Sequence, residues 1–191
     1  MLRHTGTVTL RTPRLLLRRL DRCDAESMHA NWAADEEVYR YMTSPRMPDI
    51  ADVEAFIEKK LRQYASDDYY YWGIQLENDP GVIGMVTLTE VSEFGRTANL
   101  AYTLGKPWWG MGYAREAAEK VLELAFGTVG FRKIYGCHFT ENPRSGRVLL
   151  AVGMKYTGQG KRPVFQNGRY LTYESYELTS RRYEKLRRGR A

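Results

Sequence analysis

Cysteine and histidine are scarce in this chain of 191 residues, and long apolar runs are missing. Its two cysteines, Cys23 and Cys137, form no Cys-x-x-Cys pair, which fits a reduced intracellular protein. The three histidines are scattered without metal-ligand spacing, so we expect no metal site. No apolar stretch approaches the about 20 residues that a membrane span needs, so we expect no membrane contact. Arg3, Arg11 and Arg14 interrupt any N-terminal signal region, and we expect a cytoplasmic protein.

The positive charge is concentrated at the C-terminal end. A length of 191 residues suits one domain with its own core, so we predict a single domain over residues 1–191. Most of the net charge of +6 comes from residues 180–191, where six Lys or Arg residues accompany one acid, Glu184. This basic C-terminal tail has two interpretations: a solvated, fraying end, or a handle for RNA, the ribosome or another acidic surface.

Apolar periodicity predicts an α+β fold, with a mixed, mostly antiparallel central sheet and helices on both faces. Alternating apolar residues indicate strands at 14–20, 69–76, 82–89, 97–104, 133–139, 154–159 and 170–178, the last two flanking Asn167-Gly168. Helical spacing indicates one helix that begins at Asp21 or Asp24, a second that holds residues 38–42 and a third that follows Asp49. A fourth helix runs from Ala114 to a cap at Gly127, and a fifth spans 142–151.

Two glycines, Gly110 and Gly112, lie in the turn between the strand at 97–104 and the following helix. Glycine lets the backbone approach a ligand closely, because no Cβ stands in the way. The first turn of a helix carries unpaired N–H groups and a partial positive charge. The turn is therefore a candidate main-chain cradle for a phosphate group. The alternative is a tight turn that needs glycine only for its dihedral angles.

The residues around these glycines argue against two familiar phosphate loops. A P-loop requires Lys and then Ser or Thr after its last glycine, and neither is present. A dinucleotide loop requires glycine or alanine three residues after Gly112, where Arg115 stands. The glycine spacing alone therefore does not identify the ligand.

Four runs, in order along most of the chain, resemble a single family. They are Thr12-Pro13-Arg14-Leu15-Leu16-Leu17-Arg18, Trp109-Gly110-Met111-Gly112-Tyr113-Ala114, Asn142-Pro143-Arg144-Ser145 and Gly153-Met154. Their order and spacing resemble the Gcn5-related N-acetyltransferase (GNAT) superfamily, in particular the branch that acetylates the N-termini of ribosomal proteins. Trp109 stands where the superfamily has glutamine or arginine, a form typical of the branch.

The resemblance implies a site for acetyl-CoA as cosubstrate and no metal. It places the pyrophosphate at the loop formed by Trp109, Gly110, Met111, Gly112, Tyr113 and Ala114, held by the N–H groups of the last four. Edge groups of the preceding strand, at Leu100, Tyr102 and Leu104, would pair with the pantetheine amides. Asn142 would bond to the same arm, and it is equally suited to cap the next helix.

The resemblance also implies direct attack of a neutral amine on the thioester, with Ser145 and Asn142 in the catalytic site. Ser145 would stabilise the departing thiolate; the alternative is a polar first-turn residue without a chemical role. Where the branch often has a glutamate as general base, Asn99 stands instead. The remaining candidates for the base are Glu90, Glu93 and Glu141.

The acceptor is open between three classes. An α-amine has a reference pKa of about 7.7–8.0 and lysine one of about 10.4, so a site without a strong base suits a protein N-terminus better. A small-molecule amine such as an aminoglycoside or polyamine is the second candidate. A non-catalytic acetyl-CoA or RNA-binding module, using the tail and the aromatic residues 69–72, is the third. We expect the acceptor groove between residues 32–44 and 163–168, in a monomer or homodimer.

Overall fold

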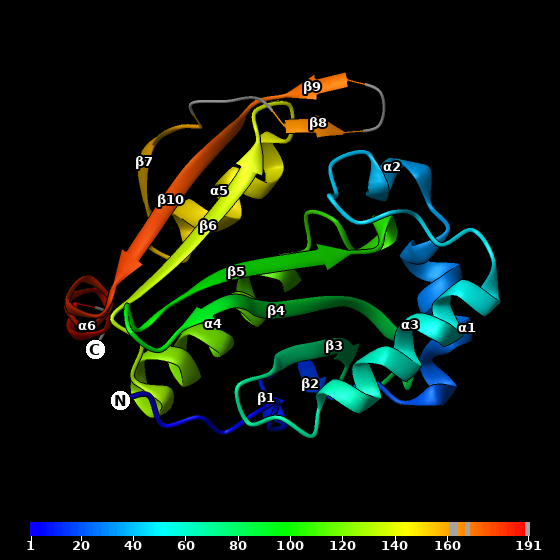
Figure 1. Cartoon of the computed structure of the whole chain (residues 1–191), viewed down its shortest axis with the longest axis horizontal. Helices are drawn as coiled ribbons and strands as arrows, with labels where there is room; N and C mark the ends of the chain where they lie inside the picture. Colours follow the sequence, from blue (N-terminus) through cyan, green and yellow to red (C-terminus); the bar gives the residue numbers. More distant parts are fainter. Residues whose placement is uncertain (161–163, 167–168, 190–191) are drawn as a thin grey trace.

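A central mixed sheet of eight strands organises the protein in the computed structural model, which describes residues 1–160, 164–166 and 169–189. The strand order is β1-β2-β3-β4-β5-β6-β10-β7 (Figure 1), and every neighbouring pair is antiparallel except β5–β6. The strands are β1 (Leu10–Arg11), β2 (Leu15–Arg18), β3 (Tyr70–Leu76), β4 (Val82–Ser92), β5 (Thr97–Leu104), β6 (Lys133–Phe139), β7 (Lys155–Gln159) and β10 (Tyr173–Thr179). A separate hairpin consists of β8 (Val164–Gln166) and β9 (Arg169–Leu171). The predicted α+β fold is confirmed.

Helices cover both faces of the sheet, and each face has its own buried cluster. On one face, behind the strands in Figure 1, lies α4 (Tyr113–Leu124), and α5 (Pro143–Ala151) packs into the same cluster. On the other face, α1 (Ala25–Met28), α2 (Glu36–Tyr39) and α3 (Ile50–Gln63) supply the second cluster. Short 3-10 or π turns occupy Arg22–Asp24, His29–Ala33, Lys106–Trp108 and Ala125–Val129.

The aromatic run at 69–72 packs the two faces of the sheet. Tyr70 and Trp72 lie in the cluster beneath α4, whereas Tyr71 lies in the cluster beneath α1 and α3. Successive residues of a strand point to opposite faces, so the run contributes to both cores. These three rings are buried and offer no surface on which bases could stack, which removes them from the predicted RNA-binding module.

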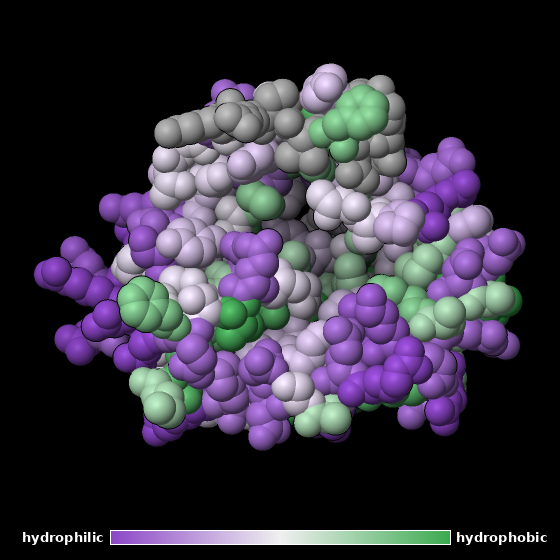
Figure 2. Space-filling model, viewed as in Figure 1, coloured by the Kyte–Doolittle hydropathy of each residue, from purple (hydrophilic) through white to green (hydrophobic). Residues whose placement is uncertain are grey.

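The strands β5 and β6 pair over only three residues and then separate. The pairs are Thr97 with Lys133, Ala98 with Ile134 and Asn99 with Tyr135. Beyond Asn99, β5 continues to Leu104 with β4 as its only ladder partner, and Figure 1 shows β5 and β6 diverging. The space-filling view of the same face has a hollow at this place (Figure 2). We call this gap the β5–β6 opening.

Several predicted boundaries are wrong. The helix after Gly112 does not end at Gly127; it continues through a wider π turn to Gly130, whose φ is +86°. The N–H groups of Gly130 and Phe131 both bond to the carbonyl of Ala125, which stabilises the extra turn. The helix expected over 38–42 spans only Glu36–Tyr39, because Asp35 caps it earlier.

Two predicted strands are shorter or interrupted. The strand expected over 14–20 ends at Arg18, whose guanidinium forms a two-point ion pair with the buried Asp24. The strand expected over 170–178 is interrupted at Thr172, whose carbonyl accepts a hydrogen bond from the N–H of Thr140. The expected turn at Asn167-Gly168 lies outside the described residues.

The basic tail is a docked helix rather than a fraying end. Residues Ser180–Arg188 form α6, and the Thr179 hydroxyl caps it by accepting from the N–H of Arg182 at 3.3 Å. The ring of Tyr183 stacks on Phe126 with centroids 4.8 Å apart, and Leu186 packs against the cluster beneath α4. The interpretation as a solvated end is therefore wrong for these residues, because an apolar stripe anchors the helix.

Candidate functional site

The loop between β5 and α4 holds both of its glycines in left-handed conformations. The φ angle is +78° at Gly110 and +82° at Gly112, values that favour glycine. A Cβ at Gly110 would meet no atom within 4 Å, so the space above the loop is open to a ligand. Gly112 is the N-cap of α4, and its carbonyl accepts from the N–H of Glu116 at 3.0 Å. The glycines thus meet a dihedral requirement and also leave open space above the loop. The structure is compatible with both interpretations, the tight turn and the phosphate cradle.

The same loop presents a group of main-chain donors. Within the described part of the chain, no acceptor takes a hydrogen bond from the N–H groups of Met111, Gly112, Tyr113 or Ala114. These groups lie at the N-terminal end of α4, where the helix dipole adds a partial positive charge. Free donors, positive potential and open space together fit the pyrophosphate of a nucleotide cofactor.

A side-chain contact crosses from β5 to α5 beside the β5–β6 opening. The phenol of Tyr102 donates to the carbonyl of Ser145 at 2.8 Å and lies 3.1 Å from its hydroxyl. Burial raises the pKa of Tyr102, and the bond to Ser145 lowers it by less, so the phenol stays protonated. The structure therefore joins Tyr102, predicted only as a strand contact, to the predicted catalytic serine.

Asn142 caps α5, as one of its two predicted interpretations requires. Its side-chain oxygen accepts from the N–H of Ser145 at 3.4 Å. The amide NH2 group takes no part in that bond and keeps two donors. Asn142 can therefore cap the helix and bond to a ligand in the opening at the same time.

The remaining predicted cofactor residues have packing contacts of their own. The side chains of Leu100 and Leu104 are buried in the core, so only their main-chain groups can face the opening. The carbonyl of Leu104 accepts from the indole N–H of Trp109 at 2.8 Å. The Trp109 ring packs against both buried clusters, and the guanidinium of Arg144 lies 5.4 Å from its centre. Trp109 thus fastens the loop to β5, and Arg144 links that loop to α5.

A family model described as the acetyltransferase (GNAT) domain matches residues 14–155, more than half of the chain. The chain belongs to the GNAT family of acetyltransferases. The predicted family is confirmed, and the protein is an acetyl-CoA-dependent N-acetyltransferase.

Similar proteins agree on this family and differ in what they acetylate. The N-acetyltransferase YoaA of Bacillus subtilis is 29% identical, over 91% of this chain and 97% of its own. The spermidine N(1)-acetyltransferase of Vibrio cholerae is 24% identical, over 88% and 95%. The solved GNAT-family acetyltransferase from Bacillus anthracis has a TM-score of 0.80 at 20% identity, over 91% and 99%. The solved ribosomal-protein-S5-alanine acetyltransferase from Vibrio fischeri has a TM-score of 0.79 at 17% identity, over 91% and 97%. These two solved structures confirm the fold.

One residue of this GNAT site was missed by the sequence analysis. Arg14, which directly precedes β2, donates from Nη1 to the carbonyl of Met111 at 3.1 Å and from Nε to Glu116 at 2.7 Å. Its guanidinium also lies 4.5 Å from the centre of the Tyr113 ring. The hydroxyl of Thr12 donates to the same carboxylate, that of Glu116, at 2.6 Å. Arg14 therefore joins the start of the chain to the loop between β5 and α4, the predicted pyrophosphate loop.

The charge of Glu116 is maintained by this contact. Partial burial raises the pKa of Glu116, but the hydrogen bonds from Thr12 and Arg14 outweigh burial and lower the pKa below its ordinary value. The ionised carboxylate holds the guanidinium, and the guanidinium in turn binds the Met111 carbonyl. The run Thr12-Pro13-Arg14 is part of the family resemblance, but nothing in the local sequence indicates its contact with a loop about 100 positions later.

A second group gathers where β5 and β6 stop pairing. Thr89 pairs with Asn99 and Ser92 with Thr97, so β4 carries one extra residue, a β-bulge. Within this bulge Glu90 has a φ of +50°, a conformation that costs a residue other than glycine of order 1–3 kcal/mol. The side-chain amide of Asn99 donates to the Glu90 carboxylate. Strain and hydrogen bond together aim that carboxylate at the end of the β5–β6 ladder.

The charge of Glu90 reaches the facing strand. Cys137 lies on the exposed side of β6, and desolvation first and the Glu90 carboxylate second raise the pKa of its thiol. By contrast, the carboxylate of Glu93 accepts from the N–H of Leu2 at 3.2 Å and bonds to His4 at 2.7 Å. Of these two predicted base candidates, only Glu90 borders the opening.

The predicted acceptor segment 32–44 lies against the end of β5. The hydroxyl of Thr103 contacts the sulfur of Met42 at 3.7 Å, and Lys106 forms an ion pair with Glu37. The second predicted segment, 163–168, is described only at 164–166, and its other residues lie outside the described part. Residues of the segment 32–44 therefore lie beside the end of β5, and their role in binding an acceptor stays a prediction.

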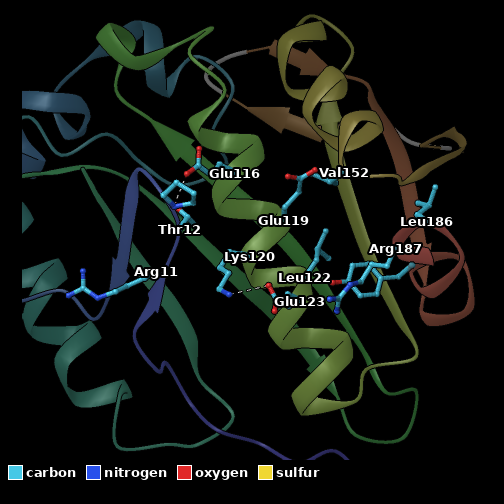
Figure 3. Close-up of a pocket in the computed structure, with 12 residues that line it drawn as sticks. Arg11, Thr12, Glu116, Glu119, Lys120, Leu122, Glu123, Val152, Leu186 and Arg187 are labelled. Atoms are coloured by element: carbon cyan, nitrogen blue, oxygen red, sulfur yellow. Dashed lines mark hydrogen bonds and ion pairs between the residues drawn. The ribbon is translucent and has the colours of Figure 1, made fainter. Parts of the chain in front are cut away.

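A separate groove of about 500 Å³ runs along the outer face of α4, toward α6 (Figure 3). Its lining carries charges of both signs, with Glu116, Glu119 and Glu123 beside Arg11, Lys120 and Arg187, and Gly110 does not contribute to it. Among the described residues there is no cluster of three metal-ligating side chains. Nor does any helix within that part of the chain have the length and apolar character to cross a membrane.

Replacing Arg14 with Gln should weaken acetyl-CoA binding by about tenfold. Loss of a charge-assisted bond to the Met111 carbonyl, worth about 1.5–3 kcal/mol, leaves the loop less ordered before binding. Arg115→Gln is the matched control, because Arg115 lies in the first turn of α4, next to the loop, but is exposed and pairs with Glu119 on its own helix. Isothermal titration calorimetry measures both. Equal affinities in the two variants would contradict a positioning role for Arg14.

Proposed function

We propose that this GNAT enzyme acetylates an amine of low pKa, best represented by the α-amine of a protein N-terminus, with Glu90 as general base. The observation that carries the proposal is the strained bulge that brings the Glu90 carboxylate to the last β5–β6 pair. Bulges re-aim side chains and are common beside active sites. The other predicted site residues then have roles that their contacts allow.

The cosubstrate site follows from the pyrophosphate loop. The N–H groups of Met111, Gly112, Tyr113 and Ala114 bind the pyrophosphate, and Arg14 keeps their loop in place. Main-chain groups of Leu100, Tyr102 and Leu104 on the open edge of β5 pair with the pantetheine, with the amide of Asn142 at the far side. Bound acetyl-CoA supplies an acetyl group activated as a thioester.

Glu90 removes the proton that the attacking amine must lose. The nitrogen–carbon bond forms as the carbon–sulfur bond breaks, and the amine proton passes to the carboxylate directly or through one water. Asn99 holds that carboxylate in place by donating a hydrogen bond from its side-chain amide. Asparagine at position 99 is then a positioning residue, with the base supplied from β4.

Ser145 stabilises the sulfur that leaves. Its hydroxyl lies in the first turn of α5, where the helix dipole favours negative charge. The protonated phenol of Tyr102 orients the serine through its carbonyl and hydroxyl. Serine is a poor acid, so this pair stabilises a thiolate rather than protonating it outright.

The predicted acceptor segment carries charges of both signs, but its carboxylates already have partners. Asp35 caps α2, Glu36 pairs with Arg46 and Glu37 pairs with Lys106. The exposed guanidiniums of Arg40, at the end of α2, and Arg144, beside the opening, suit the carbonyls or carboxylates of a peptide acceptor. A polyamine remains the second candidate because of the likeness to a spermidine acetyltransferase.

An amine panel should rank a peptide with a free α-amine above both Nα-acetyl-lysine and spermidine at pH 7. Neutralising an α-amine costs about 1 kcal/mol at that pH and neutralising a lysine about 4.6 kcal/mol, a difference of roughly 400-fold in the reactive fraction. Thiol release from acetyl-CoA gives kcat/KM, and mass spectrometry locates the acetyl group. A preference for spermidine would replace the first candidate with the second.

Ser145→Ala should lower kcat about tenfold while the KM for acetyl-CoA changes little, because the lost contact forms with the leaving sulfur. Tyr102→Phe should lower kcat less. The double variant should be no slower than Ser145→Ala alone, since both act through the serine hydroxyl. A change confined to KM would make Ser145 a binding residue.

Glu90→Gln should lower kcat/KM about 10²-fold near pH 7, the usual range for loss of a general base. The loss should shrink at high pH, where the amine is already neutral. Glu93→Gln is the control, since the Glu93 carboxylate bonds to Leu2 and His4 instead. Equal pH profiles for the two variants would rule out Glu90 as the base.

A further inference from the structure

Three cations form a stripe on the outer face of α6. Arg181, Lys185 and Arg188 follow the spacing i, i+4, i+7, which puts them on one side of the helix, and all three are exposed. Among the described residues, no ion pair uses any of them. Glu184 lies at the edge of this stripe, and exposed Arg132 lies next to the start of α6, where its carbonyl accepts from the N–H of Ser180.

The opposite face of α6 packs against the fold through half-buried side chains. Tyr183 stacks on Phe126, Leu186 packs against the core, and Arg182 donates from Nε to the carbonyl of Gly153 at 2.7 Å. A membrane-surface helix needs a free apolar face to insert between lipids. Since the apolar face of α6 is occupied, its stripe can act only through charge.

The stripe is far from the cosubstrate loop. In Figure 1, α6 lies at the end of the sheet where β5 and β6 begin. The strand β5 runs away from that end toward the loop that precedes α4. Figure 2 shows hydrophilic residues gathered at that same end. The three cations therefore do not serve the phosphates of acetyl-CoA, and their charge is available to another anion.

We infer that the stripe Arg181, Lys185 and Arg188 is a docking surface for the phosphodiester backbone of RNA. Regularly spaced, unpaired cations on a rigid helix match a polymer with regularly spaced phosphates, and such contacts need no base recognition. An anchored helix also loses little conformational entropy on binding, unlike a flexible tail. This surface would bring the enzyme to acceptors that are associated with RNA, while the RNA itself stays outside the active site.

The test compares two variants that remove the same charges at the same spacing. Lys185→Gln with Arg188→Gln alters the stripe, and Lys59→Gln with Arg62→Gln alters the exposed side of α3. Binding of a fluorescein-labelled single-stranded RNA is measured by anisotropy between 50 and 200 mM salt. Three phosphate contacts predict about a 20-fold loss of affinity over that range, and one remaining contact about a threefold loss.

The stripe variant should show the smaller salt dependence, and the α3 variant should match the wild-type protein. Circular dichroism checks that each variant is folded, and transfer to a small amine should be unchanged in both, which separates this inference from the proposed chemistry. Equal salt dependence in all three proteins, or no RNA binding by the wild-type protein, would overturn it. So would binding to phosphatidylserine vesicles in preference to RNA.

Discussion

The site depends on one topological constraint, the single parallel pair in an otherwise antiparallel sheet. Parallel strands need a crossover connection, and here that connection is α4. Because β5 and β6 point the same way, the helices that follow them, α4 and α5, both begin at the same end of the sheet. Two helix N-termini, capped at Gly112 and Asn142, therefore converge on the β5–β6 opening with their positive ends. The fold therefore prepares a site that can bind an anion, before any catalytic side chain is considered.

Side chains from distant segments then fix the width of that opening. Arg14 holds the loop from one side, Trp109 fastens it to β5, and Tyr102 reaches across to Ser145. None of these contacts closes the space above Gly110, so the framework is held on both sides and stays open at the predicted pyrophosphate loop. Pre-organisation of this kind reduces the entropy that binding must overcome.

The sequence predicted those parts whose signals are local. Alternation located β5 and β6 to the residue, and the glycine turn before α4 was placed correctly. Arg14 escaped because its partners lie about 100 positions away, and the end of α4 moved because two N–H groups share the Ala125 carbonyl. The prediction for the tail was wrong for a different reason. Charge is the strongest local signal in the tail, and only Tyr183 and Leu186, at i, i+3 spacing, indicate the apolar side of an anchored helix.

The position of Glu90 could not be read from the sequence, since it depends on a one-residue change of register between β4 and β5. As the proposed general base, Glu90 has a smaller task with an α-amine, which is nearly neutral at pH 7, than with a lysine, whose proton is held by about 4.6 kcal/mol at that pH. In the proposed reaction, the bulge that places Glu90, the Asn99 amide that holds it and a low-pKa acceptor therefore act together.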